Sequence, residues 1–129
     1  SIEFYEKYAM NCIMYKNIFH NCILQYKLQN KNIIGYGSTA KSNVLLNFCN
    51  ISNEIDWIID ENPLKQGLYT PGSNILIKNI DSLKEICENT VIVVFAWNFF
   101  NEVKSKILKY TKDVIILNIN PLQEFLPLQ

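Results

Sequence analysis

The chain has 129 residues, is about half apolar, and carries twelve lysines against twelve acidic residues, with no arginine. A neutral chain without arginine argues against nucleic acid as its main partner. No apolar run approaches the roughly 20 residues that span a bilayer, so no membrane association is expected. The four cysteines form no C-x-x-C pair, which argues against a zinc site and a disulfide framework. These features favour one cytoplasmic domain with reduced thiols.

Residues 1–29 are predicted to form one long N-terminal helix. Apolar residues spaced alternately by three and four make a continuous aromatic seam along it: Tyr5, Tyr8, Cys12, Tyr15, Phe19, Cys22 and Tyr26. Such a seam suits the chain's own sheet, a neighbouring domain, or a second copy in a homodimer. His20 lies beside it and, as the only histidine, favours a structural role over a catalytic one.

A strand, a glycine turn and a helix follow at Ile33–Tyr36, Gly35–Gly37 and Thr39–Cys49, with Ser38 or Thr39 as the expected N-cap. Gly35, Gly37 and Ala40 fit G-x-G-x-x-A, the relaxed fingerprint of dinucleotide sites. The first amides of the helix would face an anion. Alternatively, the glycines bind no ligand and only permit the chain to make the turn.

Two side chains beside this turn are candidates for ligand contacts. Lys41 would add a positive charge for a phosphate, or would be an ordinary solvated lysine. Asp60, at the end of the next strand, would hold a ribose hydroxyl. An acidic residue at a strand end is also common without any such role.

The remaining elements alternate strand and helix. Strands are predicted at Ile55–Asp60, Ile75–Ile77, Thr90–Ala96 and Asp113–Asn118, and helices at Asp81–Glu88, capped by Asp81 or Ser82, and Phe100–Tyr110. This alternation predicts an α/β chain with a small Rossmann-like three-layer fold and a mainly parallel sheet. Residues 122–129 are expected to be a tail.

Ligands of such sheets lie beyond the carboxyl ends of the strands. Four stretches are therefore expected to converge there: Gly35–Lys41, Asp60–Gly72, Ala96–Asn98 and Asn118–Asn120. Trp97 and Asn98 offer a stacking face and an amide, or simply plug the sheet end and cap a helix. Adjacent Asp60 and Glu61 should point apart, and no nucleophile, acid–base pair or metal cluster is visible. The chain on its own is predicted to bind rather than catalyse.

Three motifs occur in order and resemble the C-terminal domain of S-adenosylmethionine-dependent sugar C-methyltransferases: GYGSTAKSNVLLNFC, IDWIIDENPLKQGLYTPGSNILI and VIVVFAWNFFNEV. The similarity covers residues 31–121, with NPLKQGLYTPG as its most specific part. Such enzymes methylate a carbon of a nucleotide-linked keto-deoxysugar. In such enzymes a zinc-binding domain and a methyltransferase core precede this module, and the core carries the methyl donor and the base.

The resemblance implies that this domain carries no cofactor of its own and helps hold the nucleotide-diphosphate sugar for the core, in cis or in trans. The substrate-binding residues it implies are Tyr36, Gly37, Lys41, Asn62, Lys65, Tyr69, Pro71, Gly72, Trp97 and Asn98, beside Asp60 from the pattern above. Ser42 stands where the family commonly has glycine, and its side chain would narrow the approach to the phosphate.

Two other functions stay open at this point. One is a free-standing module that binds a dinucleotide or coenzyme, with Asp60 on the ribose. The other is a ligand-free interaction domain that works through the aromatic seam. Whether the chain, which begins at Ser1, is a fragment or free-standing is likewise open.

Overall fold

A computed structural model describes all residues except 1, 40–41, 44–45, 48, 87–88 and 119–129. The predicted tail therefore lies outside the described residues. Five strands form one parallel sheet in the order β3-β2-β1-β4-β5. Their bounds are β1 Asn32–Tyr36, β2 Trp57–Ile59, β3 Ile77–Lys78, β4 Thr90–Val94 and β5 Val114–Asn118.

The strand order confirms the predicted α/β class and parallel sheet. The chain runs outward from β1 to β3 and then returns to β4 on the other side of β1. The strand order thus reverses between β1 and β4, which hydrogen-bond along their full length from Asn32↔Thr90 to Tyr36↔Val94. Ligands of open parallel sheets bind at such a reversal.

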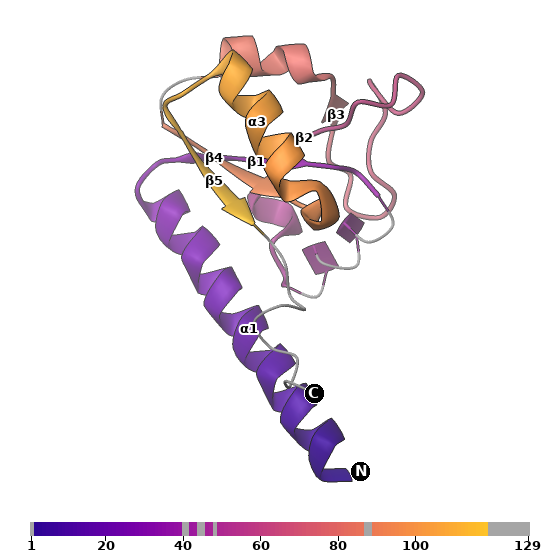
Figure 1. Cartoon of the computed structure of the whole chain (residues 1–129), viewed down its shortest axis with the longest axis vertical. Helices are drawn as coiled ribbons and strands as arrows, with labels where there is room; N and C mark the ends of the chain where they lie inside the picture. The colour runs from indigo at the N-terminus through magenta and orange to yellow at the C-terminus, as the bar shows by residue number, and fades with distance from the viewer. Residues whose placement is uncertain (1, 40–41, 44–45, 48, 87–88, 119–129) are drawn as a thin grey trace.

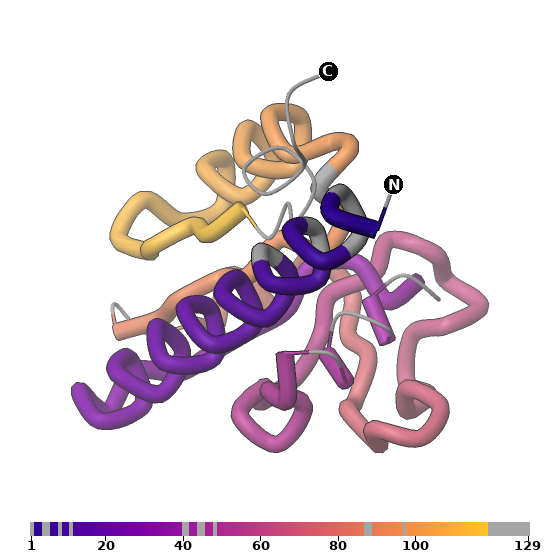
Figure 2. Tube along the Cα trace, turned by 90° about the horizontal axis from the view of Figure 1, so that it is seen from below, coloured from indigo at the N-terminus to yellow at the C-terminus, as the bar shows by residue number. Residues whose placement is uncertain are grey.

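Two apolar clusters cover the two faces of the sheet, because successive strand residues point to opposite sides. Ile33, Ile58 and Val93 face α1 (Ile2–Leu28). Ile34, Ile59 and Val94 face α3 (Phe100–Tyr110) and the 3₁₀ helix η2 (Ile80–Glu85). Figure 2 shows α1 and α3 on opposite sides of the sheet.

The long helix α1 was correctly predicted, and Tyr15, Phe19 and Tyr26 of its aromatic seam face inward. Tyr15 and Phe19 are buried with Ile23 in the cluster that covers the sheet, and Tyr26 packs against it. The ring nitrogen Nδ1 of His20 donates to the Cys49 carbonyl at 3.0 Å, because a carbonyl oxygen can only accept. This contact ties α1 to Cys49, which is buried in the same cluster. Among the described residues, no helix is long and apolar enough to cross a membrane.

Two predicted elements differ from the structure. The helix predicted at Asp81–Glu88 is the shorter 3₁₀ helix η2, and it begins earlier because the side chain of Asn79 accepts the Asp81 N–H at 2.9 Å. Neither Asp81 nor Ser82 is the cap. Asn79 caps the helix because a short amide side chain readily accepts a hydrogen bond from the backbone N–H two residues later.

The stretch Glu61–Gly72, for which neither a strand nor a helix was predicted, is partly a hairpin. Gly67 donates to the Ile77 carbonyl at 2.8 Å and Ile77 donates to the Leu68 carbonyl at 2.9 Å. Tyr69 and Leu76 form an antiparallel bridge just before β3. The returning segment thereby covers the outer edge of the two-residue strand β3, whose backbone would otherwise be unpaired.

Candidate functional site

The glycine turn after β1 is held against the neighbouring strand ends. Gly37 has φ +100° and a side chain there would lie 3.2 Å from the Cβ and the backbone nitrogen of Ala96. Its own N–H donates to the Ile59 carbonyl at 2.7 Å. Glycine is therefore required at this position both by its backbone conformation and by the close approach of the segment after β4.

The described amides of this turn already have partners within the chain. The Thr39 N–H donates to the Ser42 hydroxyl at 3.1 Å, and the Ser42 N–H donates to the Thr39 hydroxyl at 3.2 Å. This reciprocal arrangement resembles a capping box, with serine in place of the usual acid. Ser42 also donates to the Gly37 carbonyl at 2.5 Å. Buried Ser42 thus points into the turn and locks it.

Asp60 is the centre of a polar group at the carboxyl edge of the sheet, which we call the Asp60 cluster: Ser38, Asp60, Asn62 and Lys65. One carboxylate oxygen, Oδ2, accepts the Ser38 hydroxyl at 2.6 Å and the Ser38 N–H at 3.0 Å. The other, Oδ1, accepts the Asn62 N–H at 2.8 Å. The Asp60 side chain is only 12% exposed.

The electrostatics of the cluster favour an ionised Asp60. Burial opposes ionisation, but the hydrogen bonds from Ser38 and Asn62 and the charge of Lys65 together outweigh it and lower the pKa of the carboxyl from its ordinary value of 3.8. Hydrogen bonds that favour the charged form act in this direction. Asp60 is thus a fixed negative charge inside the site.

Lys65 brings a positive charge to the same place. Its ammonium donates to the Ser38 carbonyl at 2.9 Å and lies 3.7 Å from Asp60 Oδ2. The Lys65 side chain is 38% exposed, and an ammonium group has three donors. Lys65 therefore connects the loop after β2 to the glycine turn and still keeps donor capacity toward solvent.

Tyr36 lies elsewhere, in the core on the α3 side of the sheet. It is 3% exposed and packs with Ile59 and Val103. Burial, and then the negative charge of Glu61, raise the pKa of its hydroxyl well above the ordinary value. The structure does not bring this side chain to the Asp60 cluster.

The hairpin residues are also separate from the cluster. The Thr70 N–H donates to the Ile75 carbonyl at 2.8 Å, which closes the hairpin. Pro71 and Gly72 therefore form its exposed tip, at the amino end of β3. Asp60 lies at the opposite end, where its N–H donates to the Lys78 carbonyl at 3.0 Å. The three-residue step from Ile75 to Lys78 corresponds to about 10 Å. Tyr69 is exposed between these two ends.

The remaining predicted site residues follow the sheet edge. Asn98 is exposed in the 3₁₀ helix η3 (Trp97–Phe99), directly after β4. Trp97 belongs to the same helix, and its side chain lies outside the described part of the structure, as do Ala40 and Lys41. Asn118 is exposed at the end of β5, and Asn120 lies outside the described residues.

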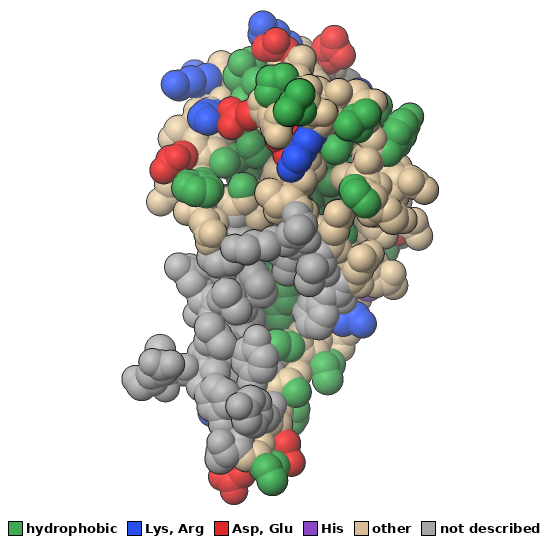
Figure 3. All heavy atoms as spheres, turned by 90° about the vertical axis from the view of Figure 1, so that its right-hand side faces the viewer, with side chains coloured by type: hydrophobic (Ala, Val, Ile, Leu, Met, Phe, Trp, Pro, Cys, Tyr) green, Lys and Arg blue, Asp and Glu red, His purple; other side chains and the backbone are tan. Residues whose placement is uncertain are grey.

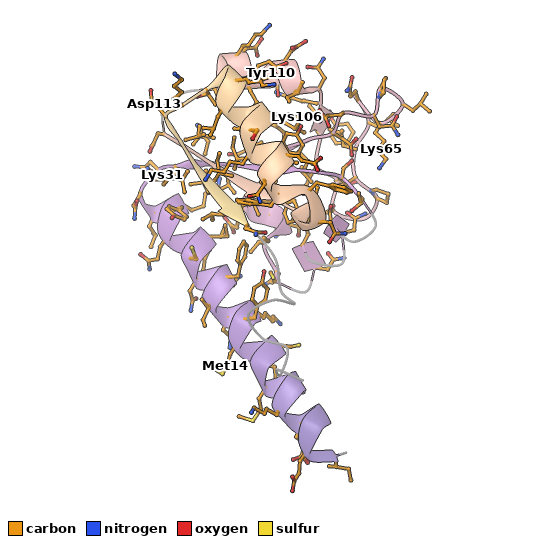
Figure 4. All side chains as sticks on the ribbon, viewed as in Figure 1. Met14, Lys31, Lys65, Lys106, Tyr110 and Asp113 are labelled. Carbon is orange, nitrogen blue, oxygen red and sulfur yellow. The ribbon has the colours of Figure 1, made fainter. Side chains whose placement is uncertain are left out.

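Glu61 points away from Asp60, as predicted for neighbours at a strand end. It forms an ion pair with Lys106 of α3 at 3.0 Å, whereas Asp60 accepts hydrogen bonds from Ser38 in the glycine turn. Figure 4 shows Lys65 and Lys106 on different parts of the molecule. In the described ranges no three His, Cys, Asp or Glu side chains are grouped to hold a metal ion.

The sequence suggested Ser38 only as a possible N-cap and Ser42 only as a side chain that narrows the approach to the phosphate; it did not predict the hydrogen bonds of Ser38 to Asp60 and of Ser42 to Thr39 and Gly37. The spacing T-x-x-S at Thr39–Ser42 is a weakened capping-box pattern and could have indicated the reciprocal bonds. No local pattern pairs Ser38 with Asp60, because this contact depends on the register between β1 and β2, Tyr36↔Ile59.

A comparison with known protein families gives the match described next, whereas no match to a curated protein sequence was found. The family model described as "C-methyltransferase C-terminal domain" matches residues 1–117, which include α1 and the whole sheet apart from its last residue. The parallel sheet, the glycine turn and the Asp60 cluster all lie inside the matched region. The chain belongs to the C-methyltransferase C-terminal domain family.

Proposed function

We propose that this domain holds a nucleotide-diphosphate keto-deoxysugar while a separate methyltransferase core, in cis or in trans, transfers the methyl group from S-adenosylmethionine. The observation that carries the proposal is the ammonium of Lys65, whose side chain is 38% exposed and is fixed beside the glycine turn at the carboxyl edge of the sheet. Family membership supplies the link to C-methylation.

The hydrogen bonds of the turn influence how a diphosphate would be held. The amides of Ser38, Thr39 and Ser42 are used inside the chain, so they are not free to bind phosphate oxygens. Among the described groups of the turn, the attraction is then left to a cationic side chain, and an ammonium acts as a point charge suited to phosphate. Lys65 is the described group in that position.

The same contacts weigh against a plain dinucleotide site with Asp60 on the ribose. Asp60 Oδ2 accepts two hydrogen bonds from Ser38 and faces Lys65. This carboxylate mainly positions the turn and the lysine. Its role in the proposed site is therefore to hold Lys65 in place, while the sugar and base extend along the ends of β1 and β4 toward Asn98.

Charge on the surrounding surface is mixed. Figure 3 faces the side of the molecule at which the hairpin lies, and basic and acidic side chains are interspersed over it. Affinity for a diphosphate should consequently depend on a few placed groups rather than on a broad positive patch. A single lysine substitution is then a sensitive test.

The experiment is a titration of the chain with a thymidine-diphosphate sugar, followed by amide NMR shifts at Gly37, Ser38 and Lys65. We expect saturable shifts at these amides and at least about tenfold weaker binding in Lys65→Met, because one charge-assisted contact is lost. Lys106→Met is the matched control and should bind like the parent.

Two results would contradict the proposal. One is the absence of any shift at the turn with millimolar nucleotide-sugar. The other is equal binding by the parent and by Lys65→Met. If NAD or coenzyme A shifted the same amides at lower concentration than the nucleotide-sugar, the chain would instead be a dinucleotide or coenzyme module.

A further inference from the structure

The outward face of α1 carries a mainly apolar stripe whose members are exposed, apart from half-buried Leu24, in the described part of the structure. It lies half a turn of helix from the buried face, because Met10 and Leu28 are each nine residues, about two and a half turns, from buried Phe19. Met10 is 64% exposed and Met14 is 52% exposed. We call this the outer stripe: Met10, Met14, Asn17, Asn21, Leu24 and Leu28.

The spacing of the outer stripe is that of a helix–helix seam. Its positions alternate by four and three residues without interruption, which is the heptad spacing of paired helices. It is distinct from the aromatic seam, whose members Tyr15 and Phe19 are buried against the sheet. In Figure 4 the labelled Met14 points away from the body of the domain.

The stripe is also free of charge. Between Lys7 and Lys27 the only charged residue of α1 is Lys16, and it lies toward the core, close enough to lower the pKa of the Cys49 thiol against the stronger effect of burial. A second copy of this helix would therefore meet no like charge along the stripe, and no charge would have to be buried.

The order of side chains selects the partner and its direction. The six positions are symmetric about residue 19, so an antiparallel copy centred there places methionine against leucine and asparagine against asparagine. The contacts would be Met10 with Leu28, Met14 with Leu24, and Asn17 with Asn21. A two-fold interface requires this reciprocity, and paired seam asparagines fix register.

We propose that two copies of this chain associate through the outer stripes of their α1 helices, antiparallel and centred at position 19. The body of the domain lies on one side of α1 (Figure 1), where Tyr15, Phe19 and Ile23 pack against the sheet, so the two bodies would lie on the outer sides of the helix pair. The overlap from Met10 to Leu28 is about 27 Å long. The dimer is independent of the proposed sugar binding.

The first test is sedimentation equilibrium over a concentration series. We expect a mass of twice the 15.0 kDa of the chain, and in Met14→Lys a dimer dissociation constant raised at least ~100-fold, since an unpaired charge enters the seam. Ile2→Lys is the matched control: Ile2 is also exposed on α1 but lies outside the overlap and should leave the dimer intact.

The second test is directional disulfide trapping. The double variant Met10→Cys with Leu28→Cys should cross-link between chains above the level of the parent, whose own cysteines set the baseline. Either single variant should not, because the two copies of one position are about 27 Å apart in an antiparallel pair. Cross-linking by the single variants would show a parallel pair and overturn the proposal.

Two further results would also overturn it. One is a parent chain that stays monomeric at all concentrations tested, and the other is a dimer unaffected by Met14→Lys. Circular dichroism and thermal unfolding establish that each variant is folded; the stripe residues changed are exposed, so unfolding temperatures near that of the parent are expected. Binding of a methyltransferase core that displaces the second copy would assign the stripe to that core instead.

Discussion

Replacing Asp60 by asparagine tests whether the Asp60 cluster organises the site. The change keeps the size of the side chain and removes its charge. The two carboxylate oxygens accept three hydrogen bonds: from the Ser38 hydroxyl at 2.6 Å, the Ser38 N–H at 3.0 Å and the Asn62 N–H at 2.8 Å. An asparagine side chain has only one acceptor oxygen, so it cannot accept from both Ser38 and Asn62. Its NH₂ group would face one of these donors, leaving that donor unsatisfied.

The expected loss of stability follows from those bonds. A hydrogen bond to a charged group contributes about 1.5–3 kcal/mol, and an unsatisfied buried donor costs about 1–3 kcal/mol. The neutral amide is easier to bury than the carboxylate, which offsets part of this loss. We expect Asp60→Asn to lower the free energy of unfolding by about 2 kcal/mol at pH 7.

The pH dependence has a definite sign. The pKa of Asp60 is lowered in the folded state, so its stabilising effect is fully present above its unfolded pKa of about 3.9 and is lost as the pH falls through the lower folded value. The difference between parent and Asp60→Asn should therefore be constant from pH 7 to pH 5. It should shrink below about pH 4.

Urea unfolding at pH 7, 5, 4 and 3, followed by circular dichroism, measures both quantities. Asp81→Asn is the control, since the Asp81 side chain is 64% exposed and its ion pair with Lys84 is 3.8 Å long; we expect a change below about 0.5 kcal/mol. The reasoning fails if Asp60→Asn costs no more than the control at pH 7, or if its cost is the same at pH 3 as at pH 7.

Two further predictions concern the turn and a thiol. Gly37→Ala should lower the free energy of unfolding by about 2–4 kcal/mol, because Gly37 has a positive φ and an added side chain would press on Ala96. Gly67 also has a positive φ, but no atom lies within 4 Å of an added Cβ, so Gly67→Ala should cost about 1 kcal/mol. Equal losses for the two variants in urea unfolding would refute the steric argument. Burial raises the pKa of Cys49 to about 11, so mass spectrometry should find this thiol unmodified by iodoacetamide at pH 8 until urea is added, and rapid labelling of the folded chain would contradict it.

The strands could be predicted because their sequences admit few alternatives. The run Val91–Val94 within β4 is short and apolar throughout, which is typical of strands covered on both faces. The helix α3 has apolar residues on one side only, and Val103 and Ile107 are buried as that pattern requires. Fold class and element order follow from such local patterns.

The interior of the site could not be predicted in the same way. That Asp60 bonds Ser38 depends on the register of two strands and on the path of a loop, which no local pattern encodes. Tyr36 next to the glycine turn was predicted to approach the ligand. Strand alternation, however, turns its side chain to the α3 side of the sheet, where it is buried.

The hydrogen bonds of the glycine turn distinguish it from the turn of a dinucleotide site on the same kind of fold. In a dinucleotide site the open amides after β1 bind the phosphate directly. Here the described amides of Ser38 and Thr39 donate instead to the Asp60 carboxylate and to the Ser42 hydroxyl. The same turn holds the Lys65 ammonium through the Ser38 carbonyl. In the proposed function this lysine would orient a charged group of the substrate, and the methyl transfer itself would take place on a neighbouring core.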